Sequence, residues 1–326
     1  SFSFCSGKRT ASGVGDDVRS WGPPFTPGGE SCYHAVVNRN KKSVAIDLKH
    51  DAGQRLVLLI YYFVVSHAKV LAKRLASKCD VLIENFKPGT MKRFGLDYDT
   101  LAQQNEKLIY CSITGYGSNG PYVTRAGYDI IAEALSGFMH VNTCTSGNPQ
   151  QVAVALIDMI TGLYAHGAIL TALLQRNQTG KGQKVECNLL ATQMAALLNV
   201  ASNYLNAGVL DCSEAVQRES ILPCQAFRTK DQRYFVVAVG SDSGFKKLCR
   251  LIGMPSIAED QRFRSNKDRI KNKNDLTELL SKRFLEEDLK YWERTVTDDS
   301  LASAPVNNLQ EAFEHPQVLL NAFTFQ

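Results

Sequence analysis

The sequence DVLIENF at Asp80–Phe86 and the sequence LIYCSI at Leu108–Ile113 decide the fold, because a Pro/Gly turn and a helical stretch separate these two β-rich runs. The same alternation continues on both sides, with further candidate strands at Val44–Leu48 and Gln183–Cys187. Strands separated by helices are typical of βαβ units, in which a parallel sheet carries helices on its faces. The fold class is therefore α/β. The expected helical stretches are Asp51–Lys78, Gly89–Phe94, Tyr128–Met139, Asp158–Arg176 and Leu189–Asn206.

The character of the chain changes after about Gly208. A strand at Tyr234–Val239 and a helix at Gly244–Ile252 are followed by a strongly charged stretch. This stretch, Asp260–Arg294, has the Lys/Glu spacing of solvated helices. We expect a large domain at residues 15–222 and a smaller α+β domain at residues 223–326. The total of 326 residues agrees with two domains of the usual ~150 residues each.

The composition is that of a folded globular protein, with 44% hydrophobic and 21% charged residues, which excludes a disordered or fibrous chain. The net charge of +5 suits an anionic small ligand and is too small to indicate nucleic acid. The longest apolar run, Leu56–Val65, has ten residues, against the ~20 that a membrane-spanning helix needs. We therefore expect neither nucleic acid nor a membrane as a partner.

The nine cysteines and six histidines show no spacing typical of a metal site. The cysteines stand singly without a CxxC pair, which indicates reduced thiols in an intracellular protein. We therefore expect no metal ligands. The sequence also lacks a GxGxxG after a strand, typical of dinucleotide sites, and the GxSxG nucleophile elbow of hydrolases.

Asp158 is a candidate catalytic residue, because it directly follows six apolar residues at the start of a helical stretch in VAVALIDMITGLYAHGAI. A carboxylate near a helix N-terminus is favoured by the helix dipole and by unpaired N–H groups. Two interpretations stay open from the residues alone. Asp158 is either a helix-capping aspartate or a carboxylate held at a strand-to-helix junction, where α/β proteins bind their ligands.

Two loops after predicted strands are candidate binding loops. The first, Glu84–Gly89, is a strand end that runs into an Asn/Pro/Gly turn. Lys87, Lys92 and Arg93 bring positive charge to it, which suits phosphate. The second, Gly115–Pro121, is rich in glycine and permits the close approach of a ligand or another backbone. A plain connecting loop is the alternative interpretation of each.

Six segments of the chain, taken together, carry a family resemblance: NRNKKSVAIDLKHDAG, CDVLIENFKPGTMKRFGLDYDTL, LIYCSITGYGSNGPY, RAGYDIIAEALSGFM, VAVALIDMITGLYAHGAILTALLQRNQTGKGQKVECNLL and PVNNLQEAFEHPQV. In this order they resemble the class III CoA-transferases, from about Gly15 to about Val318. The resemblance implies a Rossmann-like parallel-sheet large domain, a smaller α+β domain and an interlocked homodimer.

The resemblance also implies a site. In the family the aspartate of a D-x-x-T-G segment is the nucleophile, which here is Asp158 in Asp158–Gly162. Its carboxylate attacks a CoA thioester, and a mixed anhydride and then an aspartyl-CoA thioester form. Arg93 suits a phosphate partner, because its guanidinium is planar and permanently charged. The residues implied in CoA binding are Ile46, Lys49, Asn85, Phe86, Arg93, Thr114 and Tyr116.

The implied reaction moves CoA from an acyl-CoA donor, such as succinyl-CoA, to a small dicarboxylic acid such as glutarate. The CoA thioester is then a substrate, and no tightly bound cofactor is expected. The implied location is the mitochondrion, otherwise the cytoplasm.

Two alternatives to this function stay open. One is an α-methylacyl-CoA racemase, whose relatives carry Gly-His-Asp where this chain has Gly127-Tyr128-Asp129. A tyrosine, with a pKa of about 10, does not easily replace imidazole as a base at neutral pH, which disfavours the racemase. The other alternative is an inactive CoA-binding fragment.

The fragment alternative rests on departures from the family pattern. The family's first strand and helix have no counterpart before Gly15, and its C-terminal return to the large domain has none after Val318. Residues 56–69, LVLLIYYFVVSHAK, have the character of an insertion, because their removal restores the length and register of the family's helix. Arg218 stands where relatives carry a histidine.

Overall fold

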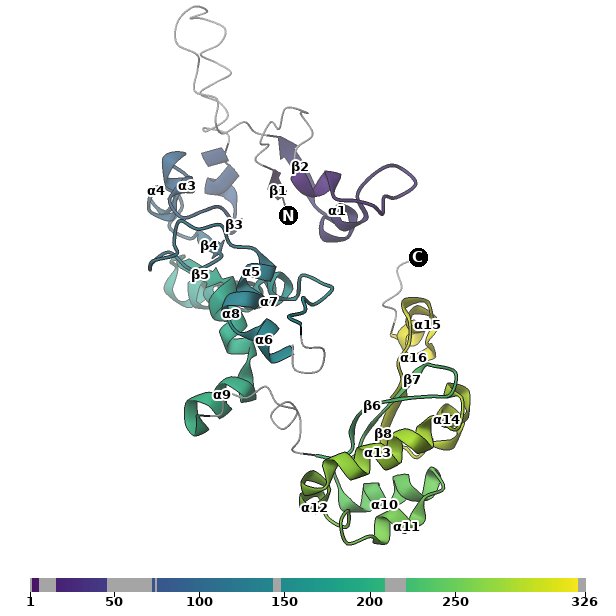
Figure 1. Cartoon of the computed structure of the whole chain (residues 1–326). Coiled ribbons are helices and arrows are strands. Elements are labelled where there is room, and N and C mark those ends of the chain that lie inside the picture. The colour runs from purple at the N-terminus through teal and green to yellow at the C-terminus, as the bar shows by residue number, and fades with distance from the viewer. Residues whose placement is uncertain are drawn as a thin grey trace, which may run out of the picture. The chain divides into compact units, whose positions relative to one another are not determined.

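A computed structural model describes residues 2–5, 16–45, 72–73, 75–142, 148–208 and 221–321. They divide into two compact units (Figure 1). Unit 1 contains the residues up to His140 together with Pro149–Ala201, and unit 2 contains Val141–Asn148 and the residues from Ser202 onward. The domain limits at residues 15–222 and 223–326 stay a prediction. Residues 56–69 and Arg218 lie outside the described residues.

Unit 1 is built around a three-stranded parallel sheet of β3 (Val81–Glu84), β4 (Ile109–Thr114) and β5 (Lys184–Asn188), in that order. All three strands fall on runs that the sequence predicts. A second parallel pair consists of β1 (Phe2–Cys5) and β2 (Lys42–Ala45), and β2 overlaps the first predicted strand. Parallel strands need long crossover connections, which helices supply here, so the α/β prediction is confirmed.

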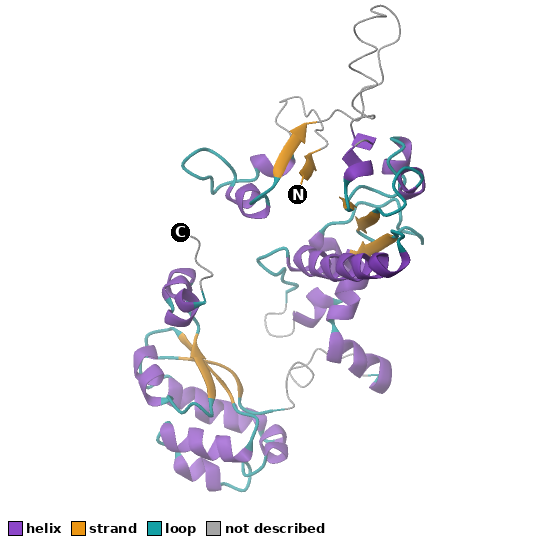
Figure 2. Ribbon diagram, turned by 180° about the vertical axis from the view of Figure 1, so that it is seen from behind, coloured by secondary structure: helices purple, strands orange, loops and turns teal. Residues whose placement is uncertain are grey.

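Helices cover both faces of this sheet. Because side chains alternate between the two faces along a strand, neighbouring residues of β4 pack against different helices. Ile109 and Cys111 of β4 pack against α7 (Leu156–Thr179). Tyr110, between them, packs on the other face with residues that include Leu101 of α4 (Tyr98–Ala102). Figure 2 shows the strands of this sheet between the long helix and a group of shorter ones.

Three helices meet near the beginning of α7. Ala132 of α5 (Asp129–Leu135), Ile157 of α7 and Leu189 of α8 (Leu189–Ala196) form one buried apolar cluster. β5 passes directly into α8 through Asn188, whose Oδ1 accepts a hydrogen bond from the Ala191 N–H at 2.8 Å. The packing therefore brings the first turns of α5 and α8 beside the first turn of α7.

Two predicted helices are each divided in the structure. Tyr128–Met139 separates at Gly137, with φ 84°, into α5 and α6 (Phe138–Asn142). Leu189–Asn206 separates at Leu198, with φ 39°, into α8 and α9 (Leu198–Ala207). A right-handed helix needs a negative φ at each residue, so the positive φ at these two positions interrupts it. The prediction from side-chain periodicity therefore merged two helices into one in each case. The other helices of unit 1 are η1 (Asp17–Ser20), α1 (Cys32–Val37) and α3 (Thr90–Arg93).

Unit 2 is an α+β unit with a three-stranded antiparallel sheet in the order β6-β7-β8. Its core contains five phenylalanines and Trp292, whose indole N–H donates to the Phe284 carbonyl at 3.0 Å. The strands are β6 (Cys224–Arg228), β7 (Tyr234–Ala238) and β8 (Ala302–Pro305). The helices are α10 (Asp242–Leu251), α11 (Pro255–Glu259), α12 (Asn266–Lys271), α13 (Lys273–Phe284), α14 (Leu289–Thr295), α15 (Leu309–Glu314) and α16 (Pro316–Leu320).

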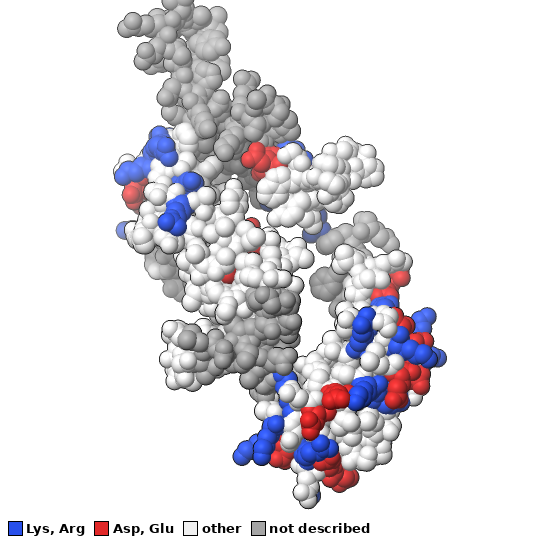
Figure 3. Space-filling model, in the orientation of Figure 1, with Lys and Arg blue, Asp and Glu red and all other residues white. Residues whose placement is uncertain are grey.

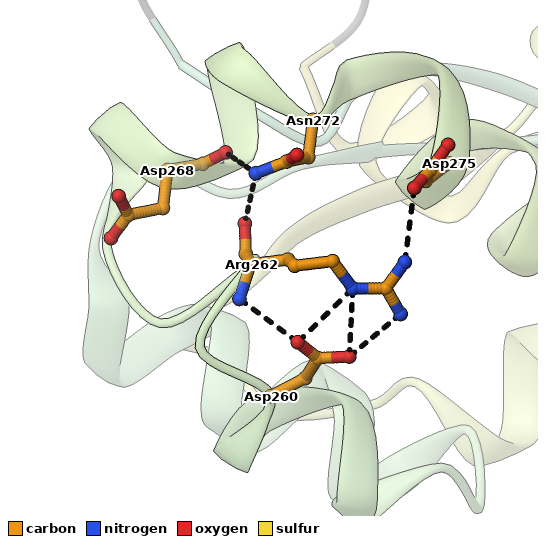
Figure 4. Close-up of polar contacts among 5 residues, drawn as sticks. All are labelled: Asp260, Arg262, Asp268, Asn272 and Asp275. Atoms are coloured by element: carbon orange, nitrogen blue, oxygen red, sulfur yellow. Dashed lines mark hydrogen bonds and ion pairs between the residues drawn. The ribbon is translucent and has the colours of Figure 1, made fainter.

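The charged stretch of unit 2 forms helices with exposed ion pairs, as its spacing predicts. Arg262 contacts Asp260 at 2.8 Å and Asp275 of α13 at 3.0 Å (Figure 4). Exposed pairs of this kind contribute little to stability, because water and salt screen the two charges. Arg269 differs from them, because it is fully buried and its Nε donates to the Leu222 carbonyl at 2.7 Å. The sequence pattern does not distinguish this buried arginine from its exposed neighbours.

α7 is, within the described part of the chain, the one helix whose length and apolar composition would allow it to cross a membrane. Ile157, Ala165 and Ala172 of this helix are buried in unit 1, which accounts for one apolar face. On its other face Leu163 and Leu174 are 69% and 67% exposed. A single chain therefore leaves the second apolar face of a core helix uncovered.

Candidate active site

Asp158 is the third residue of α7 and is exposed to solvent. It does not cap the helix, because the N-cap position is Ala155, which has no side chain able to cap. The helix-capping interpretation is therefore wrong. The second interpretation is correct only in part. Asp158 does lie at a helix N-terminus, but no strand precedes α7 in residues 148–155, so the predicted strand-to-helix junction is absent there. An accessible carboxylate without a capping duty is free for other chemistry.

The first turn of α7 is capped by a side chain from another helix. Asp129, the first residue of α5, accepts hydrogen bonds through Oδ2 from the N–H groups of Ile157 at 2.7 Å and Asp158 at 3.0 Å. These are two of the N–H groups that a helix N-terminus leaves unpaired. Asp129 is 7% exposed, so this cap is a buried carboxyl group bound to the backbone of Asp158.

The surroundings of Asp158 disfavour its ionised form. Although the residue reaches solvent, the protein atoms around its carboxyl group remove part of its hydration and raise its pKa, and the negative charge of Asp129 raises the pKa further. A carboxylate with a raised pKa is more basic than an ordinary aspartate, and basicity favours nucleophilic attack.

Two glycines hold the glycine-rich loop against the segment that leads to Asp129. A Cβ on Gly115 would lie 2.8 Å from the Gly127 Cα, and a Cβ on Gly127 would lie 2.6 Å from the Gly115 Cα. Neither position therefore accepts a side chain without a shift of the backbone. The Gly115 carbonyl accepts from the Leu190 N–H of α8 at 3.1 Å, which fixes the same loop to a third segment. The glycines of this loop thus permit the close approach of another backbone segment that the sequence predicts.

The predicted residues Thr114 and Tyr116 both make contacts within this loop. The Thr114 hydroxyl accepts from the Gly117 N–H at 2.9 Å, and the Tyr116 hydroxyl donates to the Ala126 carbonyl at 3.1 Å. The Tyr116 ring also meets the Tyr122 ring edge-on, with centroids 5.6 Å apart. Thr114 and Tyr116 therefore shape the loop whatever they bind.

A cavity of about 260 Å³ lies along one face of the sheet and is lined by residues of all three strands, among them Glu84 and Thr114 at the carboxyl ends of β3 and β4, the usual ligand position in an α/β sheet. Glu84, on its wall, accepts from the Ser112 hydroxyl at 2.5 Å and from the Phe86 N–H at 2.9 Å, which closes the corner after β3. Lys87 and Lys92 add positive charge, and Figure 3 shows basic side chains over the region of α3 and α4.

The structure brings only some of the predicted residues together. Thr114 lines the cavity, whereas Asn85, Phe86 and Arg93 lie beside its wall on the corner and on α3. Asp158 is not among the lining residues. Ile46 and Lys49 lie outside the described residues. Within the residues that the structure describes, no group of three or more His, Cys, Asp or Glu could hold a metal ion.

Sequence reasoning missed a buried polar cluster next to Asp158. Glu133 of α5, Thr161 of α7 and Gln193 of α8 are all fully buried. The available signal was the spacing in DIIAEAL, where Asp129 and Glu133 stand four residues apart in an otherwise apolar helix and so share one face.

A comparison with known families fits these observations. The model of CoA-transferase family III matches residues 11–61 and 63–326. The chain belongs to CoA-transferase family III. It is 40% identical over 314 residues to the succinyl-CoA:glutarate CoA-transferase of Homo sapiens, covering 96% of this chain and 68% of the human protein. It is 36% identical over 309 residues to the succinate–glutarate CoA-transferase of Agrobacterium fabrum, covering 93% and 73%.

Solved structures of CoA-transferase family III proteins share this fold. A CAIB/BAIF family protein from Brucella suis has a TM-score of 0.83 and 34% identity, covering 99% of this chain and 81% of that chain. Rv3272 from Mycobacterium tuberculosis has a TM-score of 0.80 and 29% identity, covering 96% and 79%. The predictions of the family, the fold and a CoA-transferase enzyme with CoA thioester substrates are confirmed. Both curated relatives are named transferases, which gives the racemase alternative no support.

Proposed function

We propose that this CoA-transferase moves CoA from succinyl-CoA to a dicarboxylic acid such as glutarate, and that Asp158 carries the acyl group covalently. The human and Agrobacterium relatives are named for transfer between these acids. The observation that supports the role of Asp158 is its position, exposed at the start of α7 with the anion Asp129 behind it. This arrangement makes the carboxylate accessible and more basic than usual.

The proposed reaction conserves acyl bonds throughout. An Asp158 oxygen attacks the thioester carbonyl of succinyl-CoA, the C–S bond breaks, and CoA thiolate leaves a succinyl–aspartyl anhydride. The thiolate then attacks the aspartyl carbonyl, which releases succinate and forms an aspartyl-CoA thioester. The acceptor carboxylate attacks that carbonyl and expels the thiolate to form a second anhydride. Attack of the thiolate on the acceptor's acyl carbon gives the product thioester and restores Asp158. Water must be excluded, because it would hydrolyse the anhydrides.

The proposed CoA contacts lie around the corner after β3. Arg93 ends α3, and Lys92 precedes it, so two cations stand on one turn beside the cavity. Phosphate groups of CoA would pair with them, because an Arg guanidinium binds phosphate through two parallel hydrogen bonds. Asn85, Phe86, Thr114 and Tyr116 complete the described part of this proposed site, and Ile46 and Lys49 belong to the same proposal.

Labelling tests the proposed nucleophile directly. Incubation with succinyl-CoA followed by mass spectrometry should place an adduct on the peptide that contains Asp158, and hydroxylamine should remove it. Asp158→Asn should lose the adduct and at least ~1,000-fold in transfer rate, as expected for removal of a nucleophile. Asp268→Asn, in unit 2, is the matched control and should keep both. A wild-type protein that transfers CoA without an adduct on Asp158 would contradict the mechanism. Binding of CoA without adduct or transfer would instead support the inactive alternative.

The proposal includes a homodimer that covers the outer face of α7. Leu163 and Leu174 on this face are 69% and 67% exposed in the single chain. Burial of a leucine is worth ~1.5–3 kcal/mol, which favours association through this face. Analytical ultracentrifugation should show a dimer that Leu163→Glu converts to monomer, while Gln178→Glu on the same helix should leave it intact. An unchanged Leu163→Glu dimer would exclude this interface.

The mitochondrial location is part of the same proposal and is supported by the resemblance to the glutarate enzymes. Subcellular fractionation of cells that express the natural protein tests it. Recovery only in the cytosolic fraction would contradict it.

A further inference from the structure

A layer of buried polar side chains lies behind the proposed nucleophile. α5, α7 and α8 first meet through Ala132, Ile157 and Leu189. One turn further along the other two helices, α7 carries Thr161 and α8 carries Gln193, while Glu133 follows Ala132 directly on α5. These three polar residues are each fully buried. The contact of the three helices thus changes from apolar to polar within one turn of Asp158.

Most polar atoms of this layer have no hydrogen-bond partner within the described residues. They are both carboxylate oxygens of Glu133, the Thr161 hydroxyl, both amide atoms of Gln193 and Oδ1 of Asp129. Buried polar atoms without partners are rare, because each costs free energy that folding must offset. Their concentration next to one functional carboxylate indicates a role beyond packing.

No cation neutralises the two buried carboxyl groups within the described residues. Apart from Tyr164, the ionisable side chains in the first three turns of α7 are Asp158 and the exposed His166. α8 carries no charged residue, and Arg125, from the preceding loop, stacks over the Tyr122 ring at 4.0 Å. His140 lies on the following helix, α6. Two like charges four residues apart on a helix repel one another, which disfavours a negative charge on both Asp129 and Glu133.

The hydrogen bonds decide which of the two keeps the charge. Asp129 accepts from two amide N–H groups, and bonds of this kind stabilise a carboxylate anion. Neither carboxylate oxygen of Glu133 has a partner within hydrogen-bond distance in the described part of the chain, and the nearby Val152 backbone lowers the pKa of Glu133 by less than its burial raises it. Burial, and then the charge of Asp129, raise the pKa of Glu133. The hydrogen-bond geometry therefore favours the negative charge on Asp129, which has two amide donors, over Glu133.

We propose that Asp129 is the positioning residue of the active site: it fixes the first turn of α7 and places one negative charge behind Asp158, while Glu133 stays neutral beside it. This inference rests on the proposed role of Asp158 as acyl carrier. Acylation converts the Asp158 carboxylate into a neutral derivative and so removes its repulsion from Asp129. The buried charge thereby favours acylation over the free carboxylate.

The variant Asp129→Asn tests the charge while it keeps an oxygen that accepts both amide hydrogen bonds. The measurement is the rate of adduct formation on Asp158 from succinyl-CoA against pH, in a single turnover. Without the charge, the acid limb should shift to lower pH and the rate at neutral pH should fall several-fold. Glu106→Gln, an exposed residue of unit 1, removes the same charge and should follow the wild-type profile. If the Asp129→Asn profile coincides with the wild type, the inference is wrong.

The two proposals fail in different ways. A wild-type protein that forms no adduct on Asp158 would contradict the proposed function. An adduct that forms with the same pH profile in the wild type and in Asp129→Asn would contradict only this inference. Infrared spectroscopy provides a second readout that does not require activity. At neutral pH the wild type should show a protonated carboxylic C=O band that Glu133→Gln lacks. If that band is absent from the wild type, Glu133 is ionised and the assignment of charges is wrong.

Discussion

Glu133 makes the stability of the fold depend on pH. Burial and the charge of Asp129 raise its pKa above the ordinary 4.5, so above that pH the folded chain binds more protons than the unfolded chain. The free energy of unfolding therefore falls as the pH rises from 4.5 through the folded pKa. We predict that Glu133→Gln has a higher Tm than the wild type at pH ~8 and that this advantage disappears toward pH ~4.5. Thermal denaturation followed by circular dichroism checks it. If the Tm of the wild type instead rises relative to that of Glu133→Gln as the pH increases, the folded protein stabilises the ionised form of Glu133, and the prediction is wrong.

Two cysteines should resist thiol reagents in the native protein. Burial raises the pKa of Cys111 and of Cys249 to about 12, and only the thiolate reacts. We predict that iodoacetamide at neutral pH modifies the partly exposed Cys32 and Cys224 well before these two. Peptide mapping by mass spectrometry measures the order, and the unfolded protein, in which all four should react alike, is the control. Early modification of Cys111 or Cys249 would contradict their burial.

At the scale of single residues, the sequence predicts the candidate nucleophile Asp158 but not the residue that binds its backbone. Asp158 stands out because a single carboxylate follows an apolar run. Its cap comes from Asp129, which lies 29 residues earlier in the chain and reaches α7 only through the packing of α5. Local spacing does not contain such a contact. For the same reason the sequence pattern suggested that the Asp158 side chain caps the helix. In the structure the Asp158 backbone N–H is instead capped by the Asp129 side chain.

Among the elements, the contact of Gly115 with Gly127 positions the glycine-rich loop against the start of α5. Gly127→Ala would place a Cβ 2.6 Å from a backbone carbon, so one segment has to move. We predict a loss of ~1–3 kcal/mol in the free energy of unfolding, the usual cost of overpacking, and slower adduct formation on Asp158. Denaturant titration measures the first effect.

A glycine with open space provides the matched control. Gly167 lies within α7 and has nothing within 4 Å of an added Cβ, so Gly167→Ala should be neutral or stabilise by up to ~1 kcal/mol through helix propensity. Equal losses in both variants would show that the close approach at Gly127 does not matter.

The predictability of the elements followed the strength of their patterns. β3, β4 and β5 were predictable, because each is a short β-rich run bounded by turn residues. The break between α8 and α9 was not, because LLATQMAALLNVASNYLN keeps good helix formers across the positive φ at Leu198. Sequence periodicity reports which side chains are apolar, and it contains no direct information on backbone dihedral angles.

For the whole molecule, the two tryptophans provide one reporter for each unit. Trp292 is fully buried in the core of unit 2, whereas Trp21 of unit 1 is 53% exposed. In a Trp21→Phe background the fluorescence of Trp292 follows unit 2 alone. We predict that Phe263→Ala lowers the stability seen by Trp292 by ~3–5 kcal/mol, because a fully buried phenylalanine leaves a cavity.

A core substitution in unit 1 is the control for this experiment. Leu101 is 1% exposed and belongs to a separate core cluster, so Leu101→Ala should change the circular dichroism transition more than the Trp292 transition. If both substitutions move the Trp292 midpoint equally, the units unfold as one cooperative body.

The capping of α7 by Asp129 of another helix has a consequence for the chain before folding is complete. Since Ala155 cannot close the helix and Asp129 arrives only with α5, the first turn of α7 is left frayed in any partly folded state. A chain in that state would present Asp158 without the Asp129 carboxyl group beside it, and the pKa of Asp158 would lie closer to that of an ordinary aspartate.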